Sequence, residues 1–312
     1  MVQTARGASL PRIGVALWLL KRRPAAGIDS VARRDNPGKW KMIFMRNSKR
    51  WRRSRAQRRL GRAGWPLTWG RLQTRGGSHH IRRMCGRYAS FLPAEALARL
   101  FGTAGPLPNL EPTWNMAPTK AAPIVRFDRE AGERRLEVAK WGLVPFFTKD
   151  LAKARKPINA RSETVARLPL FKEAFARRRC LVPAAAYYEW RHDPSGKTPF
   201  AIARSDGEPV ALGGMWEIWR SGGETLRTFA TLTVEANPML APIQERMPVI
   251  IERTDWPLWL GEEDGDVTAL LRPLPADQLR IWPIERTVNN VRNDGPELLK
   301  PRSLPDEQPI LV

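Results

Sequence analysis

Cysteine and histidine are scarce in this sequence of 312 residues. It has two cysteines, Cys85 and Cys180, and three histidines, of which only His192 follows position 84. Two cysteines cannot build the disulfide framework of a small secreted protein, and they suit a reducing, cytoplasmic location. No apolar run approaches about 18 residues, so we expect no membrane-spanning helix. The sequence indicates no metal ion and no organic cofactor.

Acidic residues are nearly absent from the first 83 positions. Residues 1–83 hold 22 of the 53 Lys and Arg residues but only two acids, Asp29 and Asp35. This segment therefore carries +20 of the formal charge of +22, which leaves +2 for residues 84–312. One interpretation is a basic tail that binds nucleic acid. The abrupt change of composition at Met84 favours the other, a disordered or untranslated extension ahead of a domain at 84–312.

From residue 84 onward, apolar periodicity and turn residues indicate a folded domain. We expect helices at 93–101, 168–178 and 254–260. We expect strands at 124–127, 136–141, 180–190, 200–203, 210–219, 225–234 and 249–251. Many strands with few long helices between them predict a single α+β domain that is mainly antiparallel β.

Several short segments in this domain carry recognisable residue patterns. They are Met84-Cys-Gly-Arg-Tyr88, Trp114-Asn-Met-Ala-Pro118, Trp141-Gly-Leu-Val-Pro145, Asn159-Ala-Arg-Ser-Glu-Thr164, Tyr187-Tyr-Glu-Trp190, Arg246-Met-Pro248 and Val288–Pro296. As an ordered set they resemble the SOS-response-associated peptidase family, also called abasic-site processing proteins. The resemblance covers nearly all of residues 84–312 and implies a β-barrel-type core with peripheral helices. It also implies a monomer that acts on abasic sites in single-stranded DNA during the SOS response.

The family resemblance assigns Cys85 the central role. An abasic site is in equilibrium with a ring-opened aldehyde. A cysteine at position one offers an α-amine, which forms a Schiff base, and a thiol, which then closes a five-membered thiazolidine. Removal of Met84 would expose that amine. On position alone, Cys85 could equally be an ordinary buried thiol.

Two polar residues match the family's proton-handling positions. Asn159 corresponds to the asparagine beside the cysteine and sugar, and its amide can donate to an oxygen or accept from the amine. Glu189 corresponds to the catalytic glutamate. On a strand it shares a face with Tyr187, while Tyr188 and Trp190 face the other way. Without the resemblance, Asn159 could be a turn residue and Glu189 half of an ion pair.

One position departs from the family pattern. Gln244 stands where the family usually has a histidine that is implicated in lyase chemistry and cross-link reversal. Glutamine forms hydrogen bonds but cannot shuttle protons near neutral pH. We therefore expect the cross-link to form, to reverse slowly and to give weak strand scission.

The DNA-binding residues that the resemblance implies are basic or apolar. Arg87 and Arg161 match arginines that hold backbone phosphates, for which their forked donors are suited. Trp141, and Pro118 near Trp114, lie in segments that the family uses beside the DNA, and we assign Trp141 to base stacking. Three further tryptophans are assigned to the core: Trp216, Trp256 and Trp259.

Two other functions remain open. The family name implies a peptidase, in which Cys85 would remove its own leader. Such an enzyme needs a base for the thiol, and no histidine is evident for that task. Alternatively, residues 1–83 are the active part, as a basic tail that binds DNA without a covalent bond.

Overall fold

The structure is a computed structural model and describes residues 86–194 and 196–302. Strands dominate this part of the chain. The strands are β1 (Tyr88–Ser90), β2 (Thr113–Met116), β3 (Ala121–Asp128), β4 (Glu133–Trp141), β5 (Asn159–Arg161), β6 (Arg179–Ala184), β7 (Ala186–Asp193), β8 (Gly196–Arg204), β9 (Val210–Ser221), β10 (Glu224–Glu235), β11 (Arg246–Pro248) and β12 (Leu279–Pro283). The α-helices are α1 (Ala94–Phe101), α2 (Ser162–Val165), α3 (Lys172–Arg177) and α4 (Trp256–Leu260). Short 3-10 helices are η1 (Arg253–Asp255), η2 (Val267–Leu270), η3 (Ala276–Gln278), η4 (Arg286–Asn289) and η5 (Pro296–Leu299).

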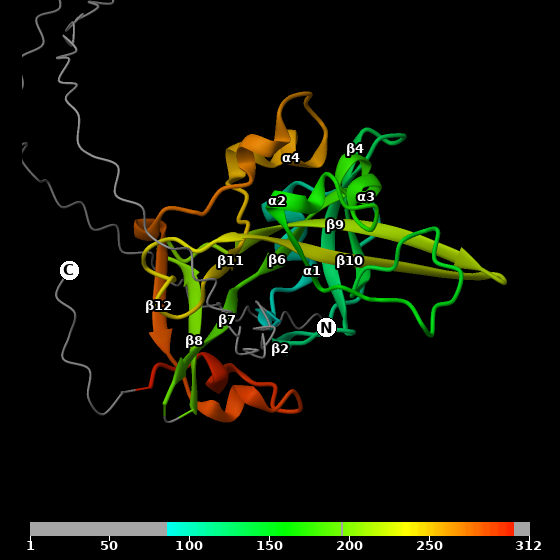
Figure 1. The fold of residues 1–312 in the computed structure, drawn as a ribbon. Helices are drawn as coiled ribbons and strands as arrows, with labels where there is room; N and C mark the ends of the chain where they lie inside the picture. Colours follow the sequence, from blue (N-terminus) through cyan, green and yellow to red (C-terminus); the bar gives the residue numbers. More distant parts are fainter. Residues whose placement is uncertain (1–85, 195, 303–312) are drawn as a thin grey trace, which may run out of the picture. The chain divides into compact units, whose positions relative to one another are not determined.

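Five strands close into a barrel, because β9 pairs with both β6 and β10. The order around it is β10-β4-β3-β6-β9, and β9 then meets β10 again. Every pairing in this ring is antiparallel except that of β10 with β4, which is parallel. β9 and β10 form the long hairpin that is prominent in Figure 1. The predicted mainly antiparallel β fold with a barrel-type core is confirmed.

Strand β10 continues beyond the barrel and organises the candidate site. One of its edges pairs with β4 at Thr228–Phe229 and then with β5 at Thr231–Thr233, both in parallel. Its other edge passes from β9 to β11. The short strands β5 and β11 are thereby held at one end of the barrel.

The second sheet has the order β12-β8-β7-β1-β2 and separates two hydrophobic cores. Tyr187 on β7 is fully buried in the main core, whereas Tyr188 faces a smaller core that includes Val288 and Leu298. This alternation is the period of two expected for a strand. It confirms that Tyr187 and Tyr188 face opposite ways.

Several predicted elements have different bounds in the structure. The helix predicted at 93–101 is present as α1, and the strands predicted at 124–127 and 136–141 are present within β3 and β4, which pair with each other. The strand predicted over 180–190 is two strands, since β6 belongs to the barrel and β7 to the second sheet. The chain changes sheets at Ala185, whose N–H donates to the carbonyl of Ala89 rather than continuing the β6 ladder. The helix predicted over 168–178 is only α3.

No helix in the described residues is long and apolar enough to cross a membrane.

Candidate active site

Asn159 is the first residue of β5 and is held against β10. It pairs with Thr231, and the Thr231 N–H donates a 3.0 Å hydrogen bond to the carbonyl of Ile158. The Thr231 hydroxyl, on a side chain only 2 % exposed, donates at 2.5 Å to Oδ1 of Asn159. Because Oδ1 accepts this bond, the amide of Asn159 is fixed in one orientation, with its nitrogen as a donor.

Trp141 supports Asn159 from inside the core. Its indole Nε1 donates a 2.9 Å hydrogen bond to the carbonyl of Ile158. Its ring lies between those of Tyr88, at 5.1 Å, and Phe229, at 6.1 Å. The side chain is 1 % exposed, so no face is open to a base. The base-stacking role predicted for Trp141 is therefore wrong, and its place in the structure is that of a positioning residue.

Glu189 lies on β7, on the same face as Tyr187 and 1 % exposed. Tyr187 pairs with Tyr88 on β1, and Tyr88 packs against Trp141. The pairing of β7 with β1 and the ring contact of Tyr88 with Trp141 thus connect the strand of Glu189 with the support of Asn159. A carboxyl group shielded from water to this degree is suited to transferring a proton rather than to a solvated ion pair.

Gln244 precedes β11 in the connection from β10 and is 4 % exposed. Its backbone N–H donates to the carbonyl of Leu240 at 2.9 Å, and its Oε1 accepts from the N–H of Glu245 at 3.1 Å. The side chain is therefore fixed by its oxygen. A histidine at this position would need different contacts, because its imidazole would replace that amide acceptor.

Arg87 has partners other than the phosphate that the sequence predicts. Its Nη1 donates to Oδ1 of Asn115 at 2.6 Å and to the carbonyl of Val288 at 2.9 Å, and its guanidinium lies over Trp190. Burial lowers the pKa of Arg87 from its usual value. Asn115, fully buried, donates through Nδ2 to the carbonyl of Val288. Arg87 therefore fastens the start of β1 to the C-terminal segment, and its phosphate contact stays a prediction.

Arg161, in contrast, is exposed at the end of β5, as a phosphate-binding residue needs to be. Close to it in sequence, Glu163 accepts two 2.9 Å hydrogen bonds from Arg246. These bonds lower the pKa of Glu163 and keep it ionised. The charge of Arg246 is thus compensated, whereas Arg161 has no ion pair among the described residues.

Pro118 follows β2 in a tight connection to β3. The next residue, Thr119, has a positive φ of 72°, which is unfavourable for a β-branched side chain. Its N–H donates at 2.9 Å to the carbonyl of Trp141. Pro118 is therefore held next to the strand end that carries Trp141, and it is half-buried.

A pair of exposed aromatic rings follows the Trp141 segment, and sequence reasoning missed it. Phe146 and Phe147 are 54 % and 52 % exposed and pack edge to face. Trp219 donates from Nε1 to the carbonyl of Thr148 at 2.8 Å, and Arg178 lies over the Phe146 ring. The signal was available in the sequence, because two adjacent phenylalanines precede a run rich in exposed cations: Lys149, Lys153, Arg155 and Lys156.

The two cysteines differ in what the structure shows. Cys180 is fully buried on β6, and burial raises the pKa of its thiol, which keeps it protonated and unreactive. Cys85 lies outside the described residues, as does the basic segment 1–83. Among the core tryptophans, Trp256 and Trp259 are buried as predicted, and Trp216 is partly buried between Arg126 and Arg227.

Comparison with known proteins gives one consistent result. Residues 84–291 match the family model described as SOS response associated peptidase (SRAP). The chain is 32 % identical over 224 residues to the abasic site processing protein YoqW of Bacillus subtilis, covering 70 % of this chain and 99 % of that protein. It is 29 % identical over 235 residues to the abasic site processing protein YedK of Escherichia coli, covering 70 % and 100 %. A crystal structure of a Bordetella bronchiseptica protein is similar with a TM-score of 0.58 and 28 % identity, covering 64 % of this chain and all of that one.

Proposed function

Because the chain belongs to the SOS response associated peptidase (SRAP) family, we propose that it captures abasic sites in single-stranded DNA as a thiazolidine on Cys85. The observation that carries this proposal is the fixed amide of Asn159, which Thr231 orients as a donor beside the exposed Arg161. A ring-opened sugar with its 3′ phosphate offers the two acceptors that such a pair would bind.

The reaction has two bond-forming steps. The α-amine of Cys85 adds to the aldehyde carbon, and loss of water gives the imine. The nitrogen of this imine keeps its proton. The thiol sulfur then adds to the imine carbon, which closes the five-membered ring, and the thiol proton passes to Glu189. Glu189 supplies a proton to the departing hydroxyl and recovers one from the thiol, so the site returns to its starting state. Asn159 holds the sugar oxygen in reach of the amine.

The reactive form requires a free α-amine on Cys85. In the printed sequence this amine lies in a peptide bond with Met84. The reaction therefore needs protein that begins at Cys85, and the 312-residue chain as printed does not form a thiazolidine.

The DNA strand would be held by groups next to the fixed amide. Arg161 contacts the phosphate at the lesion, and Pro118 limits the path of the sugar. Phe146 and Phe147 replace Trp141 as the rings that stack on neighbouring bases, at about 1–3 kcal/mol per base. Single strands are preferred, because a paired and stacked sugar cannot reach a nucleophile in an enclosed site.

The direct test is a gel assay for a covalent adduct. Protein that begins at Cys85 is incubated with an abasic single-stranded oligonucleotide, and Cys85→Ala and Asn159→Ala variants serve as comparisons. We expect a denaturation-resistant adduct with the parent protein, none with Cys85→Ala, and slower formation with Asn159→Ala. An adduct that survives in Cys85→Ala, or no adduct at all, would show that the proposal is wrong.

Self-cleavage by Cys85 is the alternative function. It requires a base next to the thiol and donors for an oxyanion. The one histidine of the described residues, His192, is exposed on β7 near the β7–β8 turn, and so does not supply that base. Intact-mass measurement of the purified 312-residue chain over time separates the two functions, since only self-cleavage releases the segment ahead of Cys85 without any added peptidase.

A further inference from the structure

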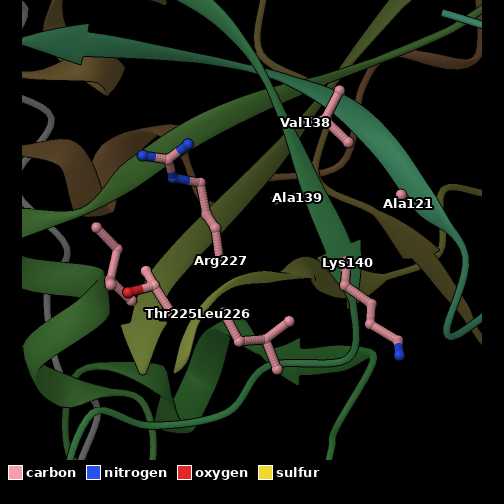
Figure 2. Close-up of a pocket in the computed structure, with 8 residues that line it drawn as sticks. Ala121, Val138, Ala139, Lys140, Thr225, Leu226 and Arg227 are labelled. Atoms are coloured by element: carbon pink, nitrogen blue, oxygen red, sulfur yellow. The ribbon is translucent and has the colours of Figure 1, made fainter. Parts of the chain in front are cut away.

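The open strand edges of this fold differ in what the structure places next to them. Between β4 and the β9–β10 hairpin lies a groove of about 430 Å³ (Figure 2). The strand registers place Lys140 on the same face as the aliphatic Val138 and Leu226, so the lining does not indicate one kind of occupant. The outer edge of β12 in the second sheet is different, because the chain itself leads onto it.

Every second peptide group of β12 points away from its neighbour β8. The Ile284 N–H donates to the Pro199 carbonyl at 3.1 Å, and the Gln278 carbonyl accepts from the Ser205 N–H at 3.0 Å. These bonds and the antiparallel register show that the even-numbered residues of β12 pair their peptide groups with β8. The N–H and carbonyl of Ile281 therefore point to the outer side, where no strand pairs with β12 in the described residues.

The chain returns to this outer side at its last described residues. Pro301 forms an antiparallel bridge with Ile284, and the Arg302 N–H donates a 2.8 Å hydrogen bond to the carbonyl of Pro283. These two contacts fix both the direction and the register of approach. Each residue further along the chain meets the residue one position earlier on β12.

We propose that residues 303–306 of this chain add a short antiparallel strand to β12 and cover its outer edge. In the register set by Arg302, Leu304 exchanges two backbone hydrogen bonds with Ile281, and the Asp306 N–H donates to the carbonyl of Leu279. The N–H of Leu279 already donates to the carbonyl of Ala276. The added strand therefore matches each peptide group that β12 offers, and it closes the edge against a strand from another molecule.

The positions of proline agree with this register. Pro301 and Pro305 are odd-numbered, so their nitrogens point away from β12, where a missing N–H removes no hydrogen bond of the ladder. The residues that have to donate to β12 are Arg302, Leu304 and Asp306, and each has an N–H. A shift by one residue would place Pro305 at a donating position.

The side chains on the two faces of β12 also suit this segment. Ile281 is partly buried and packs against the main core, and Leu304, directly opposite, covers the part of it that is open to water. On the other face Arg280 is exposed above the ring of Trp282 and has no ion pair among residues 86–194 and 196–302. Glu307 follows on that face, diagonal to Arg280, and supplies a carboxylate.

Hydrogen exchange of single backbone amides in the full chain tests this pairing. The Ile281 N–H is the probe, because the added strand bonds it. The N–H of the adjacent Trp282 faces β8 and is the internal control. In a chain that ends at Arg302, we expect exchange of Ile281 to become about tenfold faster relative to that of Trp282.

Two proline substitutions in the full chain test the register. Leu304→Pro removes the N–H that donates to Ile281 and should speed exchange of the Ile281 amide as the truncation does. Ser303→Pro, one residue earlier, changes a nitrogen that points away from β12 and should leave that exchange unchanged. Equal exchange of Ile281 in the full and truncated chains, or equal effects of the two prolines, would overturn the proposal. Protection of Ile281 that rises with protein concentration would assign the edge to a second copy instead, and protection that is lost on removal of residues 1–84 would assign it to that segment.

Discussion

The indole nitrogen of Trp141 donates a 2.9 Å hydrogen bond to the carbonyl of Ile158, the residue directly before Asn159. The same carbonyl accepts the backbone N–H of Thr231 at 3.0 Å. Two donors from different strands thus fix one peptide group, and this peptide group sets where Asn159 begins β5. A buried aromatic residue thereby determines the position of a polar residue that faces the site.

Replacing Trp141 with Phe should slow capture of the abasic site without weakening binding to intact single-stranded DNA. The ring packing against Tyr88 and Phe229 is largely kept, but the donor to Ile158 is lost, so Asn159 is held less firmly. We expect a several-fold lower rate of adduct formation, measured in single-turnover gels with protein that begins at Cys85.

Trp259→Phe is the matched control for that variant. Trp259 is fully buried and donates from its indole nitrogen to a backbone carbonyl, that of Cys180, at 2.8 Å. Both substitutions should therefore cost similar stability, of roughly 1–3 kcal/mol in the free energy of unfolding. If both slow capture equally, the effect of Trp141 is general loosening rather than positioning.

The hydroxyl of Thr231 should control the donor role of Asn159. Thr231→Val removes that hydroxyl at nearly constant volume. Oδ1 of Asn159 then loses its donor, and the side-chain amide group of Asn159 can flip. We expect a lower maximal rate of adduct formation. The DNA concentration that gives half of the maximal rate should change little. Thr231→Ser keeps the hydroxyl and should restore the rate. A Ser variant as slow as the Val variant would contradict this role.

The sequence predicted the fold class well, because the barrel strands are long and show clear periodicity. β9 and β10 were found within two residues of their ends. The short strands β5 and β11 were not predicted. Three residues give too little periodicity, and these strands exist only because β10 offers its free edges to them.

Some features of the candidate site were predicted correctly from the sequence, and others were not. The shared face of Glu189 and Tyr187 followed from strand periodicity alone. Trp141 was misassigned and the internal contacts of Arg87 were missed, because residue type does not reveal how deeply a tryptophan or arginine is buried. Arg87 makes its contacts with Asn115 and Val288, which are 28 and 201 positions away. Contacts over such separations are set by the tertiary fold and have no local signal.

Removing the exposed rings Phe146 and Phe147 should weaken DNA binding. The double variant to Ala loses stacking on about one or two bases, and we expect the dissociation constant for a single-stranded oligonucleotide to rise roughly tenfold. Stability should change little, because both side chains are more than half exposed. Leu168→Ala removes a similarly exposed apolar side chain, 44 % exposed, and should leave affinity unchanged in anisotropy titrations.

Arg161 and Arg87 should differ in the kind of defect that their replacement causes. Arg161→Ala removes an exposed phosphate contact, so the slope of log affinity against log salt should fall by about 0.7 for a single strand. Arg87→Ala leaves the buried Asn115 Oδ1 without its donor and should lower the melting temperature while preserving the salt slope. A reduced slope for Arg87→Ala would restore the phosphate role that the sequence predicts.

Gln244→His should speed reversal of the cross-link and make it depend on pH. Glutamine has no titratable proton, so reversal by the parent protein should be slow and nearly constant between about pH 5.5 and 7.5. An imidazole titrates near about pH 6.5 and can pass a proton to the ring nitrogen or sulfur, so the His variant should reverse faster with a transition in that range. The measurement is transfer of purified adduct to excess competing abasic oligonucleotide. Gln244→Ala loosens the same contact with Glu245 without adding a base. If the Ala variant reverses as fast as the His variant, proton transfer is not the reason, and the role predicted for this position is wrong.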